Sequence, residues 1–178
     1  MSGNRSELKP AVGPNDHAQG PDDAPITLVE YGDYECPYCG MAYPVVKLIQ
    51  ARLGDRLRFV FRNFPLAEAH PHATAAAELA EAAASQGKFW QMHDMLYEHQ
   101  TALGAADLER YVNKLELDRA ALEATLAGGA PHQRVRGDFM SGVRSGVNGT
   151  PAFFINGRRF DGDWRDAETF AAELESLP

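Results

Sequence analysis

The sequence lacks an excess of positive charge and lacks any long apolar run. Its 178 residues include 17 lysines and arginines against 25 aspartates and glutamates, which gives a net charge of −8. Phosphate backbones and anionic lipid surfaces repel a negative chain, so we expect no binding to nucleic acid. The longest apolar runs fall well short of the roughly 18 to 20 residues that cross a bilayer, so we also expect no membrane insertion.

Cysteine is scarce as well. Only Cys36 and Cys39 are present, and both lie within the segment EYGDYECPYCGMAYP, residues 30–44. A stabilising disulfide usually joins positions far apart in sequence, and a chain of this length can bury a core that needs no such staple. The close spacing of the two cysteines therefore calls for a chemical explanation.

The first 24 residues contain no apolar leader and are rich in Gly, Pro, Asn and Asp. The absence of a leader predicts a cytoplasmic location for the sequence as it stands, and a periplasmic or extracytoplasmic one if a leader has been removed. A polar segment of this kind buries too little apolar surface to offset the entropy of ordering. We expect residues 1–24 to form a flexible N-terminal arm.

The next part of the chain predicts a strand, a helix and a second strand. ITLVEYG (residues 26–32) and LRFVFRNF (residues 57–64) are typical of strands, and the apolar register from Val45 to Leu53 predicts a helix that ends at Gly54. Together they have the length of a right-handed βαβ unit with parallel strands. The two cysteines fall at its strand-to-helix turn.

The remainder predicts a helical insertion and a return to the sheet. Residues 65–145 show alanine, leucine and charged residues at helical spacing, with breaks at glycines, whereas PAFFINGRRFDG (residues 151–162) predicts two strands around Asn156-Gly157. A last amphipathic helix follows, with Asp166 as its N-cap. The predicted fold is α/β: a four-stranded mixed sheet flanked by helices, from residues 25–64 and 146–178, with an inserted all-helical subdomain at 65–145.

The chemistry of the Cys-Pro-Tyr-Cys turn follows from its place at a helix start. Unpaired backbone N–H groups and the helix dipole favour a thiolate at Cys36. Pro37 suits the first helical turn because its missing N–H would have had no partner there. Cys39 lies one turn further in, so we expect Cys36 to attack a disulfide and Cys39 to resolve the intermediate.

A second motif is Gly149-Thr150-Pro151, which begins the strand AFFIN. Proline cannot donate to a sheet ladder, and the first position of a strand is one of the few that it can occupy. A cis peptide bond at Pro151 would expose the Thr150 backbone for pairing with a substrate peptide beside Cys36. An ordinary trans proline before an edge strand is the alternative.

These motifs together resemble the thioredoxin superfamily, and within it the DsbA-like thiol–disulfide oxidoreductases. The resemblance covers residues 17–163 and includes the DsbA-like domain fused to some sodium/proton antiporters. It implies a thioredoxin fold and an enzyme that exchanges disulfides with cysteine-containing polypeptides and with an unidentified redox partner. The redox-active Cys36–Cys39 disulfide would be the only redox group, with no other cofactor. We further expect a monomer or a weak dimer.

The resemblance also assigns roles to single residues. It implies that Pro44 kinks the active-site helix, that Pro151 is the family's cis-proline, and that Pro37, Tyr38, Thr150 and Pro151 contact the substrate.

The resemblance places a further residue, Glu30, beneath Cys39 as a buried proton relay whose pKa is raised by desolvation. The strand pattern alone also permits a solvent-facing Glu30, and Arg58 or Arg62 on the neighbouring strand could be its partner.

Tyr38, where many oxidases of the family have histidine, and Thr150, where the strong oxidases have valine, imply a weaker oxidant.

Two other functions remain open. The Tyr38 motif also fits a glutathione-dependent enzyme of the glutaredoxin or kappa-transferase type. A non-catalytic binding module, in which the turn holds zinc or a static disulfide, is the second. Structural zinc usually uses two close ligand pairs, and the sequence offers only one. We therefore expect no metal site, although these histidines could be imagined as further ligands: His70, His72, His93 and His99.

Overall fold

The computed structural model describes residues 6–177 and has a five-stranded mixed sheet at its centre. The strands lie in the order β1-β3-β2-β4-β5. β2 and β3 are parallel, and the other three neighbouring pairs are antiparallel. Their bounds are β1 His17–Gln19, β2 Ile26–Gly32, β3 Leu57–Asn63, β4 Ala152–Ile155 and β5 Arg158–Phe160.

The predicted βαβ unit is confirmed. Helix α1 (Pro37–Leu53) joins β2 to β3 and is followed by a short 3₁₀ turn, η1 (Gly54–Arg56), where Gly54 has φ of +51°. Val46, Ile49 and Leu53 are buried, because positions three and four apart share one face of a helix. Pro44 lies inside this helix, as expected.

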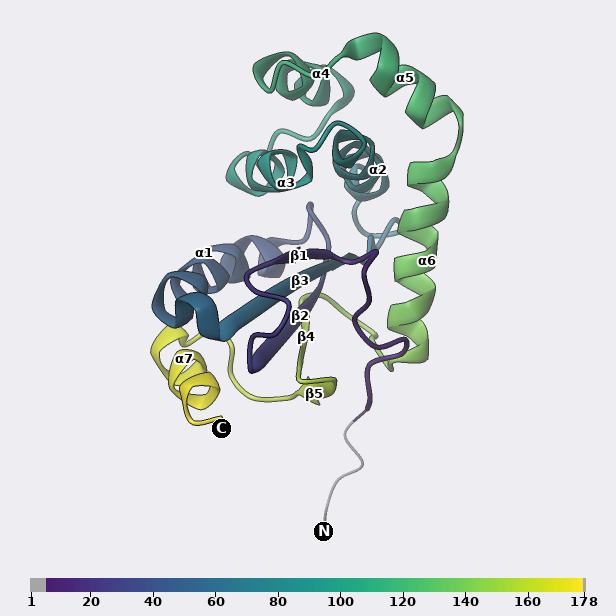
Figure 1. The fold of residues 1–178 in the computed structure, drawn as a ribbon. Helices are drawn as coiled ribbons and strands as arrows, with labels where there is room; N and C mark the ends of the chain where they lie inside the picture. The colour runs from purple at the N-terminus through teal and green to yellow at the C-terminus, as the bar shows by residue number, and fades with distance from the viewer. Residues whose placement is uncertain (1–5, 178) are drawn as a thin grey trace.

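The two faces of the sheet bury different sets of side chains. Alternate residues of a strand point to opposite faces, so Leu28 packs with α1 and Phe153 on one face, while Val29 packs with Phe154 on the other. Helices α1 and α7 (Ala167–Glu175) contact one another, and α6 (Ala130–Arg144) packs against β3. Figure 1 shows α1 and α7 on one side of the sheet and α6 on the opposite side.

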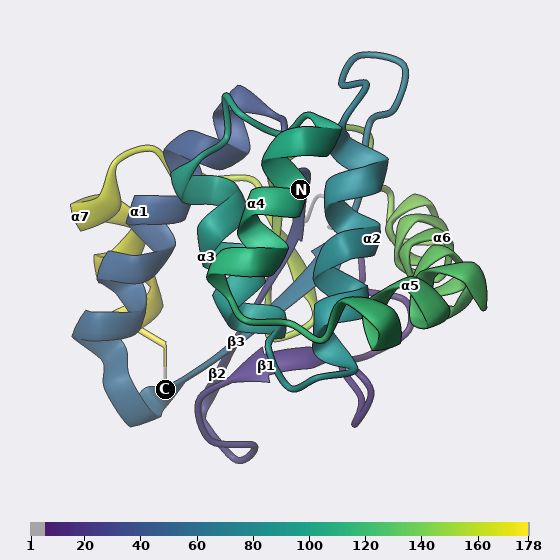
Figure 2. The ribbon, with the colours of Figure 1, turned by 90° about the horizontal axis from the view of Figure 1, so that it is seen from above.

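Five helices lie between β3 and β4 in sequence, as the helical spacing predicted. They are α2 (Ala73–Ala84), α3 (Phe89–Glu98), α4 (Ala105–Lys114), α5 (Arg119–Ala127) and α6. Gly87 and Gly129 provide two of the breaks, with φ of +72° and +79°. Seen from above, α2, α3 and α4 stand between α1 and α6 (Figure 2), and α3 also contacts α1. The insertion therefore touches the helix that carries the cysteines.

The C-terminal part agrees with the sequence pattern. Asn156 and Gly157 both have positive φ, +47° and +81°, as a type I′ hairpin requires. The Asp166 side chain caps α7 by accepting from the backbone N–H groups of Glu168 and Thr169.

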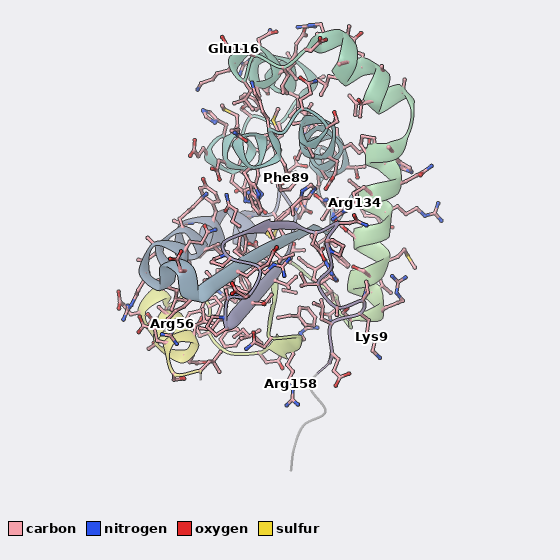
Figure 3. The ribbon with its side chains drawn as sticks, in the orientation of Figure 1. Lys9, Arg56, Phe89, Glu116, Arg134 and Arg158 are labelled. Atoms are coloured by element: carbon pink, nitrogen blue, oxygen red, sulfur yellow. The ribbon has the colours of Figure 1, made fainter. Side chains whose placement is uncertain are left out.

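The N-terminal segment differs from the prediction. Residues 1–5 of the expected arm lie outside the described residues, but residues 6–24 pack against the domain. β1 pairs with β3, which adds the fifth strand, and the Leu8 side chain is buried. Phe89 of α3 stacks on the His17 ring with centroids 3.5 Å apart, and Figure 3 labels Phe89 between α3 and β1. The composition of residues 6–24 gave the wrong prediction because strand pairing can satisfy the backbone hydrogen-bonding groups of a polar segment that has few apolar side chains.

Candidate active site

Cys36 is the N-cap residue of α1, with extended backbone at φ −71° and ψ 122°, and Pro37 is the first helical residue. Both cysteines are free thiols. The Cys36 residue is only 4% exposed and Cys39 is fully buried. Pro37 and Tyr38 beside it are exposed.

The surroundings of Cys36 favour its thiolate. A hydrogen bond from the Cys39 thiol is the largest cause that lowers the pKa of Cys36 to about 5. Desolvation opposes this shift, while hydrogen bonds from Thr150 and from the backbone N–H groups of Cys39 and Tyr38 support it. The helix start thus supplies donors to the sulfur, as expected from the unpaired N–H groups of a first turn.

Cys39 has the opposite character. Burial, the largest cause, together with the hydrogen bond to Cys36 and the charge of Glu30, raises the pKa of the Cys39 thiol well above its ordinary value. The backbone N–H of Asp33 donates to Cys39 Sγ across 3.4 Å. The Cys36 sulfur is therefore an acidic nucleophile, whereas the Cys39 sulfur keeps its proton.

Thr150 and Pro151 lie next to Cys36, although they are more than a hundred residues away in sequence. The Thr150–Pro151 peptide bond is cis, and the Thr150 carbonyl oxygen is 3.5 Å from Cys36 Sγ. The Thr150 hydroxyl is buried and has no hydrogen-bond partner among residues 6–177 in this geometry. It can turn its proton to a Cys36 thiolate, which is the contribution to the Cys36 pKa noted above.

Glu30 lies in β2 and is 2% exposed. Burial, with a smaller contribution from the charge of Cys36, raises the pKa of Glu30 to about 8. The expected arginine partners are wrong: Arg62 pairs with Asp16 and Arg58 with Asp22, because β3 directs both arginines to the face opposite Glu30. The Glu30 Oε1 atom has no partner among the described residues.

Tyr38 is 53% exposed. The Arg165 guanidinium lies over its ring, 5.6 Å from the centroid, and also over the Trp164 ring at 4.8 Å. The loop between β5 and α7 therefore borders the active-site turn.

Some residues that hold the turn were missed by the sequence analysis. The Gln100 side chain, at the end of the α3 region, donates to the carbonyl oxygens of Tyr34 (3.0 Å) and Cys36 (2.7 Å). A side chain on Gly40 would overlap the Gln100 amide, so a glycine follows Cys39. No local sequence pattern predicts the contact between Gln100 and the active-site turn, because Gln100 is far from the Cys-Pro-Tyr-Cys motif in sequence.

The histidines have separate surroundings. His93 is buried, and its Nδ1 lies 3.0 Å from the Tyr34 hydroxyl. His70 pairs with Asp33 and His72 with Glu35. Within residues 6–177, no group of three or more His, Cys, Asp or Glu side chains is arranged to hold a metal ion.

Over the same residues, no helix has the length and apolarity needed to cross a membrane.

Comparison with known proteins identifies the class. A family model described as thioredoxin matches residues 13–175. The chain belongs to the thioredoxin family.

Particular relatives fall into two groups. Among curated proteins, the chain is similar to the Na(+)/H(+) antiporter NhaA 3 of Salinispora tropica, with 45% identity over 162 residues that make up 91% of this chain and 25% of the antiporter. It is also 44% identical over 170 residues to an Na(+)/H(+) antiporter NhaA of Herminiimonas arsenicoxydans, covering 95% of this chain and 27% of that protein. The chain thus spans about a quarter of the length of the curated relatives that it matches.

Solved structures show the same fold. Oxidised BdbD from Bacillus subtilis has a TM-score of 0.79 at 22% identity and covers 97% of this chain and 95% of its own. Alpha-DsbA1 from Wolbachia pipientis has a TM-score of 0.79 at 20% identity, with coverage of 93% and 92%. A thioredoxin-like oxidoreductase from Silicibacter pomeroyi has a TM-score of 0.78 at 25% identity, with coverage of 90% and 92%. The expected resemblance and the thioredoxin fold with a helical region are confirmed, with one strand more than predicted.

Proposed function

We propose that this protein is a thiol–disulfide oxidoreductase that exchanges disulfides with cysteine-containing polypeptides. The observation that carries the proposal is the difference between its two sulfurs: the pKa of Cys36 is lowered to about 5, while that of Cys39 is raised by burial. A thiolate at the helix start and a protonated thiol one turn away are what stepwise disulfide exchange needs.

The reaction begins at Cys36. Its thiolate attacks one sulfur of a substrate disulfide, a Cys36–substrate disulfide forms, and the other substrate sulfur leaves as a thiolate. Cys39 then loses its proton and attacks the Cys36 sulfur. The Cys36–Cys39 disulfide forms, the second substrate sulfur leaves, and two electrons have passed from the protein to the substrate. The reverse sequence oxidises a substrate dithiol.

The other site residues have supporting roles in this proposal. Glu30 accepts the Cys39 proton, and its pKa of about 8 suits a group that gives and takes a proton near neutral pH. Thr150 and Pro151 present backbone to the substrate beside Cys36, and Pro37 and Tyr38 form the exposed contact surface. A second redox protein that restores the dithiol or the disulfide belongs to the proposal.

The proposal is tested by titrating Cys36 and trapping the intermediate. We expect thiolate absorbance and iodoacetamide reactivity of the reduced protein to rise with a midpoint near pH 5. Cys36→Ser should abolish exchange with a disulfide-linked peptide, whereas Cys39→Ser should accumulate a mixed disulfide visible by mass spectrometry. A Cys36 that ionises near its ordinary value of about 8.5 would overturn the proposal.

Equilibration with glutathione then gives the direction. A potential near about −270 mV is typical of a reductase and one near about −120 mV of an oxidase. Turnover of glutathione that survives Cys39→Ser would instead favour the glutathione-dependent alternative, because a monothiol route needs only Cys36. A potential below about −300 mV would favour a static disulfide in a binding module.

A further inference from the structure

A buried carboxylate and a histidine lie directly behind the active-site turn. Asp33 follows β2 and its side chain is fully buried, while His70 comes from the loop between β3 and α2. The His70 Nδ1 is 2.7 Å from Asp33 Oδ2, which also accepts from the Leu66 backbone N–H at 2.8 Å. The other carboxylate oxygen accepts from the Glu35 backbone N–H at 2.8 Å.

The same aspartate is bound to both cysteines through its main chain. Its carbonyl oxygen accepts from the Cys36 backbone N–H at 3.2 Å, and its own N–H donates to Cys39 Sγ at 3.4 Å. The Asp33–His70 pair is therefore fixed to the peptide units that hold the dithiol, and the loop between β3 and α2 brings a histidine to the segment that precedes α1.

The charges that face His70 come from one segment, between β2 and α1. They are the Asp33 and Glu35 carboxylates and the Cys36 sulfur. Burial lowers the pKa of His70, but the hydrogen bond to Asp33 and the charges of Asp33, Cys36 and Glu35 raise it above its ordinary value. On its own loop, Glu68 is exposed and the His72 Nδ1 contacts Glu35 Oε1 at 2.7 Å.

We propose that His70 is a positioning residue for disulfide exchange: it supplies beside Cys36 the cationic charge that Tyr38 in the Cys-Pro-Tyr-Cys turn does not bring. Its protonation is coupled to the ionisation of Cys36. The proposal rests on the exchange function proposed above, and it adds a residue outside the motif that tunes the thiolate.

The coupling has a defined balance. The reduced protein holds a Cys36 thiolate and a Cys39 thiol, and the negative charge of the thiolate raises the pKa of His70. Oxidation forms the Cys36–Cys39 bond, breaks a substrate S–S bond, moves two electrons to the substrate sulfurs and releases the Cys39 proton. The negative charge at Cys36 is then lost, so His70 holds its own proton less tightly and releases part of it to solvent. By linkage, the factor by which His70 favours the thiolate equals the factor by which the thiolate favours protonated His70.

The first measurement needs no variant. NMR titration of the His70 ring in the reduced and the oxidised wild-type protein should show protonation that is roughly threefold to tenfold tighter in the reduced form. In the second measurement, His70→Gln should weaken Cys36 ionisation by the same factor, because glutamine can still donate to Asp33 but carries no charge. A tenfold change corresponds to about 30 mV towards a more reducing potential.

His72→Gln is the matched control, since it removes a histidine of the same loop whose side chain is 48% exposed and whose partner is Glu35. We expect it to change Cys36 ionisation by a much smaller factor than His70→Gln. The inference is overturned if His70 titrates identically in both redox states, or if both variants act on Cys36 equally. A normal pKa for wild-type Cys36 would instead overturn the proposed function, so the two failures are distinguishable.

Discussion

Glu30 and Tyr31 are neighbours in β2, but their side chains enter opposite faces of the sheet, and the two faces treat buried polar atoms differently. On the face covered by α6, the Tyr31 hydroxyl lies 2.7 Å from Ser141 Oγ and accepts from Arg62 at 3.0 Å. Arg62 in turn binds the Asp16 carboxylate through Nε at 2.8 Å. Every polar side chain in this chain of contacts has a partner.

The face that carries the cysteines is different. Among residues 6–177, three buried side-chain atoms without a partner belong to groups around the dithiol: Glu30 Oε1, Tyr97 Oη and Thr150 Oγ1. An unsatisfied buried polar group costs about 1 to 3 kcal/mol. Arg58 Nε, on the face opposite Glu30, and Asn63 Oδ1 also lack a partner among these residues. The contrast therefore lies between the contacts from Ser141 through Tyr31 and Arg62 to Asp16, in which every side chain is paired, and the groups around the dithiol, which keep uncommitted donors and acceptors near a sulfur whose protonation must change.

The largest expected effect comes from breaking the paired contacts on the face covered by α6. Arg62→Met leaves the Asp16 carboxylate, whose side chain is 9% exposed, without its main cation. Burial alone would raise the pKa of Asp16, and the hydrogen bonds from Arg62 and Gly13 with the charges of Arg62 and Arg134 hold it below its usual value. Figure 3 labels Arg134 beside α6. We expect the variant to lose about 3 to 5 kcal/mol of unfolding free energy, measured by urea denaturation.

The control for this variant is the pair Arg62→Met with Asp16→Asn, which removes the stranded charge and should recover part of the loss. Titration of Cys36 should be unchanged in both, because Arg62 faces away from the dithiol. A loss below 1 kcal/mol, or a displaced Cys36 titration, would contradict the division between the two faces.

A smaller effect is expected at Glu30, and its sign depends on pH. The pKa of Glu30 rises from 4.5 to about 8 on folding. The folded state therefore holds this proton more tightly than the unfolded state, and the wild-type protein loses stability as pH rises through this window. Glu30→Gln has no such proton, so its stability relative to wild type should grow by more than about 1 kcal/mol between pH 5 and pH 8.

Unfolding of the oxidised proteins is the suitable measurement, since burial, the larger cause of the shift, persists when Cys36 carries no charge. The rate of disulfide exchange by Glu30→Gln should fall roughly a hundredfold, because the variant has lost the proton acceptor. A stability difference that stays flat from pH 5 to pH 8 would show that Glu30 is not a buried acid.

The βαβ unit and the site at its turn were predictable because their signals are local. Runs of β-branched and aromatic residues show where β2 and β3 lie, apolar residues at a spacing near 3.6 show where α1 lies, and a cysteine followed by proline marks the start of α1. The position of Thr150 beside Cys36 came from a family resemblance rather than from the residues, because the two are separated by the whole helical region.

The interactions that the sequence did not reveal are polar contacts between distant segments. Asp16 pairs with Arg62, Asp33 with His70, and Gln100 with the Cys36 carbonyl. Several acidic or amide side chains in the sequence could form each of these contacts equally well, and hydrophobic periodicity does not distinguish between them. The ordered N-terminal segment was missed for the same reason, since it is anchored by β1 pairing and by Arg62 donating to the Pro10 and Ala11 carbonyl oxygens.

The smallest effect compares two glycines of α6. A Cβ on Gly142 would lie 2.6 Å from the Phe64 ring and 3.1 Å from Tyr31, whereas a Cβ on Gly137 would meet nothing within 4 Å. Alanine in a helix interior gains about 0.5 to 1 kcal/mol over glycine, so Gly137→Ala should be stabilising by that amount.

Gly142→Ala should be destabilising by about 1 kcal/mol, because an overpacking cost of about 1 to 3 kcal/mol exceeds the helical gain. The Phe64 ring cannot withdraw easily, since it stacks on Phe139 with centroids 4.3 Å apart. Tyr31 is tethered by its two hydrogen bonds. If the two alanine variants are equally stable in thermal unfolding, the face covered by α6 adjusts to an added methyl group as readily as the face around the dithiol. The difference between the two faces would then lie in their hydrogen bonds alone.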